Sequence, residues 1–91
     1  MNHIVNRESV AMKTFSSESC NIANEMEDVC SHLKHMLYDA NSYMQDQSGQ
    51  EAISIVEELV EDTAVAVRFI RSLAEQIQKS AELLEESDTL L

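Results

Sequence analysis

Two histidines and two aspartates in the first half of the chain have the spacing of a helical metal pair. His32 and His35 are three residues apart, and Asp28 and Asp39 each lie four residues from one of them. On an α-helix, residues three or four apart share a face, so these side chains can approach one ion. The same spacing is typical of solvated side chains with weak ion pairing, and we favour that interpretation. We therefore predict no metal and no cofactor.

Other chemistry-bearing groups are sparse. Cys20 and Cys30 are ten residues apart in one predicted helix, a separation of ~15 Å along the axis, which is too long for a disulfide. No serine is placed beside a histidine as a nucleophile would be, and no glycine-rich loop is present to hold a phosphate. The sequence therefore predicts that the protein is not an enzyme.

Size and charge restrict the possible partners. The 91 residues form one domain, 1–91, and carry 17 acidic against six basic residues, a formal charge of −11. This charge disfavours nucleic acids and anionic membranes, because little positive charge is available to neutralise phosphates. No run approaches the ~18 apolar residues needed to insert into a membrane, and no general secretory signal pattern is seen.

Apolar residues recur in both halves of the chain at alternating steps of three and four, which predicts amphipathic helices. In the first half this row is Phe15, Ser19, Ile22, Met26, Val29, Leu33, Met36, Ala40 and Tyr43, flanked by Ala23, Cys30, Leu37 and Met44. In the second half it is Ile53, Val56, Val60, Thr63, Val67, Ile70, Ala74, Ile77, Ala81 and Leu84, flanked by Ile55, Leu59, Ala66 and Leu73. A strict seven-residue repeat predicts that the helices pack with a small angle between their axes.

The only glycine, Gly49, separates the two patterns, and the chain has no proline. We predict one helix over about 7–46, a turn at about 47–49 and a second helix over about 50–87. Ser48 is the predicted N-cap of the second helix, with Glu51 as the partner in a capping box. The alternative is that Gly49 ends the first helix.

The predicted fold class is an all-α, antiparallel helix-turn-helix hairpin that pairs into a four-helix bundle. Two helices share only one seam, so two apolar rows per helix require a further helical surface. The chain alone should therefore self-associate or be marginally stable. An exposed Phe69 is a candidate for a second contact surface. The predicted partner interface consists of Phe15, Ile22, Met26, Val29, Leu33, Val56, Val60, Val67, Ile70 and Ile77.

These features resemble the WXG superfamily, the small helical hairpins of type VII secretion systems. Members carry Trp-x-Gly in the turn and often a small residue soon afterwards. Here the stretch is Gln47-Ser48-Gly49-Gln50-Glu51-Ala52, which has the glycine and Ala52 but no tryptophan. Members also end in an export motif, and Leu84, Asp88 and Leu91 match its spacing, with leucine in place of the usual aromatic residue.

Without the tryptophan, the chain looks more like divergent members that accompany a larger secreted protein, such as an LXG-domain toxin. The resemblance implies a non-enzymatic adaptor that pairs with the toxin's helical N-terminal region, with a sister hairpin or with itself, and contributes an export signal to the secretion machinery. It would be cytoplasmic when folded and then secreted or displayed at the cell surface. The alternative is a cytoplasmic coiled-coil chaperone or assembly factor that is not exported.

Overall fold

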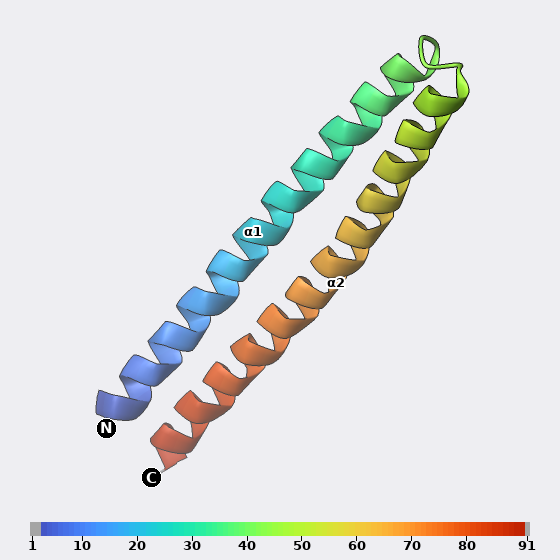
Figure 1. The fold of residues 1–91 in the computed structure, drawn as a ribbon. Helices are drawn as coiled ribbons and strands as arrows, with labels where there is room; N and C mark the ends of the chain where they lie inside the picture. The colour runs from blue at the N-terminus through green and yellow to red at the C-terminus, as the bar shows by residue number, and fades with distance from the viewer. Residues whose placement is uncertain (1–2, 91) are drawn as a thin grey trace. The chain divides into compact units, whose positions relative to one another are not determined.

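The computed structural model describes the backbone of residues 3–90 and the side chains of residues 7–87. Helix α1 spans His3–Asn41 and helix α2 spans Gln47–Leu90, and the short turn at 42–46 joins them (Figure 1). The predicted all-α helical hairpin is therefore confirmed. Both helices continue beyond the predicted outer ends at 7 and 87.

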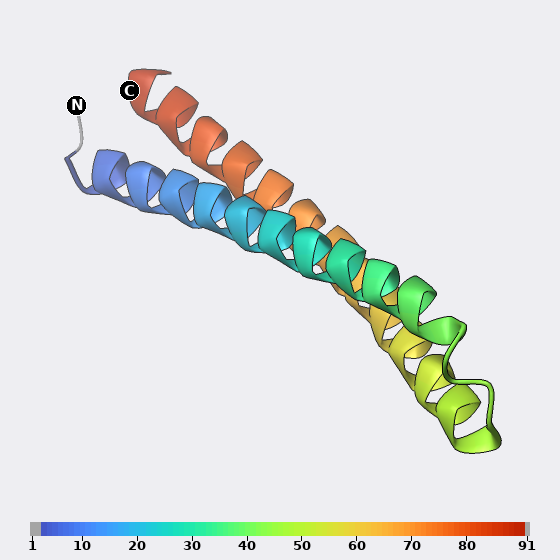
Figure 2. The ribbon, with the colours of Figure 1, turned by 90° about the horizontal axis from the view of Figure 1, so that it is seen from above.

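The hairpin divides into two compact units, each built from a piece of both helices. The turn-end unit is residues 24–68, and the open-end unit comprises the chain up to residue 23 and from residue 69. In the turn-end unit the last turns of α1 lie beside the first turns of α2, as Figures 1 and 2 show from two directions. In the open-end unit the start of α1 lies beside the end of α2, and Lys13 there contacts Glu85. The helices thus run antiparallel in each unit.

Buried residues recur every seven positions and form the seam between the helices. They are Ser9, Ser16, Ala23 and Cys30 on α1, and Ile53, Val60, Val67, Ala74 and Ala81 on α2. Ser19, between Ser16 and Ala23, is buried as well. The α2 members belong to the predicted main row. On α1 the seam combines the predicted flanking row, which contains Ala23 and Cys30, with half of the predicted main row, because Ser19 is buried and Met26, Leu33 and Ala40 are half-buried. The other half of the main row, which includes Phe15, Ile22, Val29 and Met36, is exposed. Two of the seam residues of α1, Ser9 and Ser16, are polar, so the apolar pattern of the sequence does not mark them as seam residues.

The two units differ in the size of their seam residues. The open-end unit buries small side chains, and there the Ser16 hydroxyl donates a hydrogen bond to the Ala74 carbonyl oxygen at 2.7 Å. The turn-end unit buries branched side chains, including Ile53 and Val60. Small residues let two helix backbones approach closely enough for a serine to reach across, whereas branched residues bury more apolar surface.

The turn lies before Gly49, and this corrects the predicted boundaries. Helix α1 ends at Asn41 rather than near 46, and α2 begins at Gln47 rather than near 50. The N-cap is Asp46, whose carboxylate accepts a hydrogen bond from the Gly49 N–H at 2.9 Å. The Asp46 carbonyl accepts the first helical bond, from the Gln50 N–H at 3.0 Å. Asp46 rather than Ser48 takes the capping position because the turn extends back over 42–46.

Gly49 is required for space and not for a left-handed backbone conformation. It is buried, and its φ is not positive. A Cβ at this position would lie 2.6 Å from Asp46 Oδ1, 2.8 Å from Met44 Cβ and 2.9 Å from the Met44 carbonyl oxygen. The last two atoms are fixed by the backbone of the turn, so they cannot move aside without moving the turn. The glycine therefore permits the turn to pass close to the first turn of α2.

We predict that Asp46→Ala lowers the free energy of unfolding by about 1 kcal/mol, because the Gly49 N–H loses its acceptor. Ser48→Ala is the matched control, since Ser48 is exposed inside the helix and alanine has the higher helix propensity. Urea denaturation followed by circular dichroism measures both variants. A larger loss of stability in Ser48→Ala than in Asp46→Ala would show that Ser48 is the N-cap.

Candidate partner-binding surface

The histidines and aspartates with the spacing of a metal pair lie on the surface. His32, His35, Asp28 and Asp39 are all exposed, and within the part of the chain that the structure describes no group of three or more potential ligands could hold a metal ion. Cys30 is buried, Cys20 is half-buried and both are free thiols. No helix over the described residues combines the length and apolar character that crossing a membrane requires.

A row of large apolar side chains on α1 faces outward. Phe15, Ile22, Val29 and Met36 are between 48% and 59% exposed. Each of the first three immediately precedes a buried seam residue, and Met36 continues their seven-residue spacing. Phe15 and Ile22 therefore lie at one edge of the seam of the open-end unit, and Val29 and Met36 lie at the corresponding edge in the turn-end unit.

Helix α2 carries the equivalent row, one residue before the first four of its five seam residues, whereas Ser80 precedes the fifth, Ala81. The row consists of Ala52, Leu59, Ala66 and Leu73, of which Leu59 and Leu73 are about half exposed. In an antiparallel helix pair, residues at equivalent positions beside the seam lie on the same side of it. We call these two rows, within each unit, the apolar flank.

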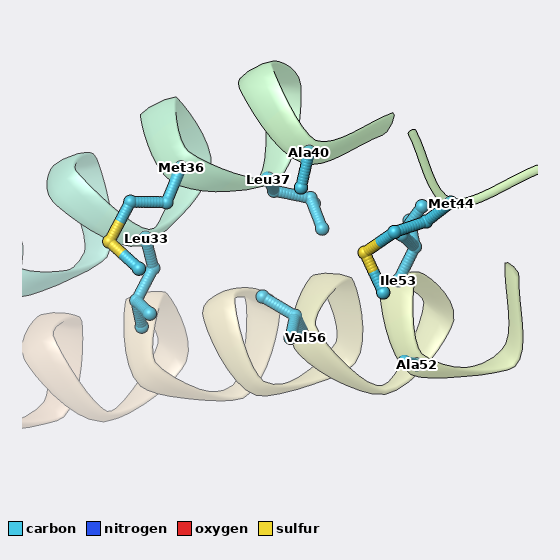
Figure 3. A pocket seen from close by; sticks show the side chains of 8 residues that line it. All are labelled: Leu33, Met36, Leu37, Ala40, Met44, Ala52, Ile53 and Val56. Carbon is cyan, nitrogen blue, oxygen red and sulfur yellow. The ribbon is translucent and has the colours of Figure 1, made fainter. Parts of the chain in front are cut away.

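The turn-end unit provides direct evidence that the two rows share one side. Met36 of α1 and Ala52 of α2 line the same cavity of about 170 Å³, together with six other apolar residues (Figure 3). These are Leu33, Leu37, Ala40, Met44, Ile53 and Val56. The apolar flank of this unit is therefore hollowed next to the turn, and the hollow offers only apolar contacts.

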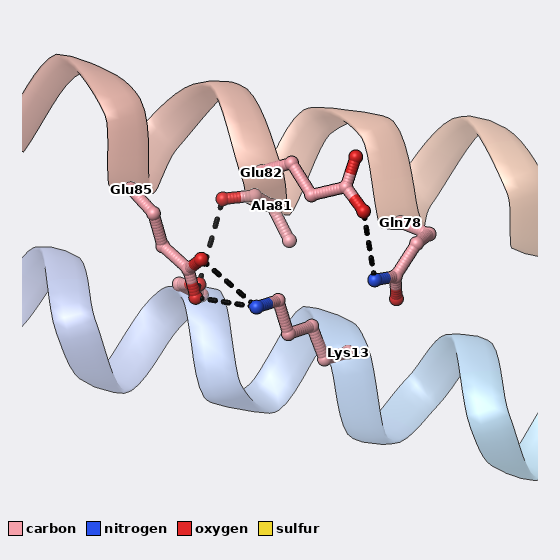
Figure 4. A network of polar contacts seen from close by, with 6 residues as sticks. Lys13, Gln78, Ala81, Glu82 and Glu85 are labelled. Atoms are coloured by element: carbon pink, nitrogen blue, oxygen red, sulfur yellow. Dashed lines mark hydrogen bonds and ion pairs between the residues drawn. The ribbon is translucent and has the colours of Figure 1, made fainter.

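In the open-end unit the other side of the seam is polar. Lys13 Nζ lies 2.8 Å from the Glu85 carboxylate, which also accepts a hydrogen bond from the Ser9 hydroxyl (Figure 4). Lys13 and Glu85 each follow a seam residue, Ser9 and Ala81, by four positions. In the same unit Ser16, Cys20, Arg71 and Gln78 line a shallow depression with further polar neighbours. We call the side of the seam that carries Lys13 and Glu85, four positions after a seam residue, the polar flank.

The contacts of Glu85 affect its titration. The hydrogen bonds from Lys13 and then from Ser9, aided by the positive charge of Lys13, hold the pKa of the Glu85 carboxyl below its ordinary value of 4.5. Partial burial acts in the opposite direction and is outweighed. A carboxyl with a lowered pKa in the folded state stabilises the fold above its unfolded pKa, and this contribution is lost as the pH falls through the folded pKa.

We predict that the stability difference between wild type and Glu85→Gln is full above about pH 5.5 and shrinks as the pH falls below about 4.5. The difference is the informative quantity, because many carboxylates of this acidic chain titrate over the same range. Glu82→Gln is the control, since the Glu82 carboxylate accepts a hydrogen bond from Gln78 instead. Urea denaturation at several pH values measures the effect, and a difference independent of pH would contradict it.

The predicted interface residues occupy three environments. Phe15, Ile22 and Val29 are exposed on the apolar flank, whereas Val60 and Val67 are buried in the seam and have little surface left for a partner. The others, which are Met26, Leu33, Val56, Ile70 and Ile77, are half-buried. Phe69 is 71% exposed, as expected.

The two motifs behind the family resemblance lie at opposite ends of α2. Gly49 and Ala52 are in its first turns, and Ser48 beside them is exposed. Leu84 is half-buried near the other end. The backbone at Asp88 is helical, but the side chain of Asp88 and the whole of Leu91 lie outside the described residues. Of the three predicted export residues, the structure therefore describes both the backbone and the side chain only for Leu84.

No protein-family model, curated protein or solved structure matches this chain.

Proposed function

We propose that this protein is a non-enzymatic adaptor that pairs with another helical protein through its apolar flank. The observation that supports this most is the pair of half-exposed apolar residues beside the seam of each unit, Phe15 and Ile22 in the open-end unit and Val29 and Met36 in the turn-end unit. Apolar surface arranged in a row along a helix pair is typical of helix-to-helix association. Pairing with a second hairpin or helical domain would bury this row and produce a helical bundle.

We further propose that the pairing serves type VII secretion. The support is the resemblance in the hairpin, in Gly49 with Ala52, and in the spacing of Leu84, Asp88 and Leu91. In this role the partner is the helical region of an LXG-type toxin or a sister hairpin. The folded pair forms in the cytoplasm, and the C-terminal motif presents it to the secretion machinery.

We predict that Asp88→Ala reduces the amount of both the protein and its partner in culture supernatant several-fold, while folding and pairing are retained. The reason is that this proposal assigns the Asp88 carboxylate to recognition by the secretion machinery. Ser87→Ala is the matched control, because Ser87 is an exposed neighbour on the same helix. Cell-associated protein is measured in parallel to correct for expression.

Equal export of Asp88→Ala and wild type would reject the signal and favour the alternative function, a cytoplasmic chaperone or assembly factor. The half-buried position of Leu84 supports that alternative, because a leucine in the main apolar row of α2 can serve the helix contact alone. Pairing through the apolar flank belongs to both functions.

A further inference from the structure

The basic residues of the turn-end unit avoid its apolar flank. Residues 24–68 contain ten of the 17 acidic residues and only two of the six basic residues of the chain, Lys34 and Arg68. Lys34 follows the seam residue Cys30 by four positions, which is the position of Lys13 and Glu85 on the polar flank. Arg68 directly follows the seam residue Val67, so it also lies on the side away from the apolar flank.

The outer border of the apolar flank is acidic. On a helix, a residue three positions further along lies on the same side. The residues three positions after Ile22, Val29 and Met36 are Glu25, His32 and Asp39. On α2 the residues three positions after Ala52 and Leu59 are Ile55 and Asp62. All five side chains are exposed, and three of them are carboxylates with no lysine or arginine among them.

This border disfavours a second copy of the chain as the occupant of the flank. If two identical flanks met, Glu25, Asp39 and Asp62 would face carboxylates, His32 or apolar side chains, whichever helix lay opposite. Like charges at the rim of an interface disfavour association, and no basic residue of this flank is available to compensate. The apolar hollow lined by Met36 and Ala52 nevertheless leaves apolar surface to be covered (Figure 3).

We infer that the apolar flank of the turn-end unit binds an amphipathic helix of a different protein, one whose apolar stripe is bordered by lysine or arginine. This inference rests on the proposed pairing with a helical protein and names the chemistry of the partner. The apolar side chains Val29, Met36 and Leu59 supply the contact area, and the carboxylates at the border select the partner by charge. Association is therefore faster at low salt than at high salt.

The test uses two synthetic helical peptides of about 28 residues, or four heptads, with the same leucine and alanine stripe. One has lysine and arginine along both borders, and the other has glutamate. Binding to the full chain is followed by fluorescence anisotropy. We expect the basic-bordered peptide to bind at least about tenfold more tightly than the acidic-bordered one.

Three variants locate the site. Leu59→Asp is expected to weaken binding of the basic-bordered peptide by more than about tenfold, because it places a charge in the apolar contact. Val65→Asp is the matched control, since it adds the same charge to an exposed valine of α2 away from both flanks. The double variant Glu25→Lys/Asp62→Lys is expected to weaken binding of the basic-bordered peptide by about two- to fivefold per residue and to strengthen binding of the acidic-bordered one. Circular dichroism confirms that each variant is helical.

Equal binding of the two peptides, no binding of either, or equal effects of Leu59→Asp and Val65→Asp would overturn the inference. The inference would also be overturned if the wild-type chain sedimented as a dimer and Leu59→Asp dissociated it, because the apolar flank would then bind a second copy of the chain. These outcomes are separate from the export measurement. If Asp88→Ala blocks export while the peptides bind equally, the secretion proposal stands and the charge-selective flank fails. If the basic-bordered peptide binds more tightly and Asp88→Ala is exported like wild type, the inferred basic-bordered partner is supported and the secretion proposal is rejected.

Discussion

Replacing Ile53 with alanine is expected to lower the free energy of unfolding by about 2–5 kcal/mol. Ile53 is 6% exposed at the seam of the turn-end unit, and it already lines the cavity of about 170 Å³. Removing three carbon atoms there loses apolar contacts and enlarges an existing hollow. Because small domains have only about 5–15 kcal/mol of stability in total, this single change is a large fraction of it.

Ile55→Ala provides a control with the same chemical change two residues away. Ile55 is 67% exposed, so its truncation is expected to change stability by no more than about 0.5 kcal/mol. Both variants gain the same helix propensity, and the difference between them therefore reports burial alone. Urea denaturation followed by circular dichroism at 222 nm is the measurement. Similar losses in the two variants would show that the seam does not pass through Ile53.

Replacing Ala81 with leucine is expected to destabilise the protein by about 1–3 kcal/mol, although leucine is more apolar than alanine. Ala81 is fully buried in the open-end unit, where the seam also contains Ser9, Ser16 and Ala74. A leucine side chain has no space between helices that approach closely enough for Ser16 to bond the Ala74 carbonyl. The helices must then separate, and this hydrogen bond is lost.

Ala11→Leu is the control for this second experiment, because Ala11 is exposed on α1 in the same unit. It is expected to leave the free energy of unfolding within about 0.5 kcal/mol of the wild-type value. Thermal or urea unfolding compares the two, and hydrogen exchange of the amides near Ala74 reports whether the helices separate. A gain in stability for Ala81→Leu would mean that the open-end seam is loosely packed.

Much of this fold could be predicted from the residues alone. The seven-residue apolar repeat and the absence of proline favour two long helices, since local hydrogen bonding and side-chain spacing are enough to specify them. The break near Gly49 was also predictable, because glycine and polar residues cluster there. The α2 seam residues Ile53, Val60 and Val67 stood out because they are β-branched and regularly spaced.

Only the tertiary structure determined which apolar residues of α1 face the seam, because Ala23 and Cys30 enter it whereas Ile22 beside Ala23 stays exposed. Two neighbouring rows compete, and the choice depends on how small residues such as Ser16 and Ala23 fit against the opposite helix, which is a contact distant in sequence. The position of the turn was decided in the same way. Asp46 caps α2 and Gly49 makes room for Met44 because the two helices must reverse direction within residues 42–46.

The same register separates the apolar flank from the polar one. Charge counting along the chain shows an acidic protein, but it does not reveal that Lys34 and Arg68 lie away from the flank while Glu25 and Asp62 border it. This separation emerges only when two helices are placed against each other in a defined rotation. Periodicity is a local property of one helix, whereas the side that remains open to a partner is a property of the pair.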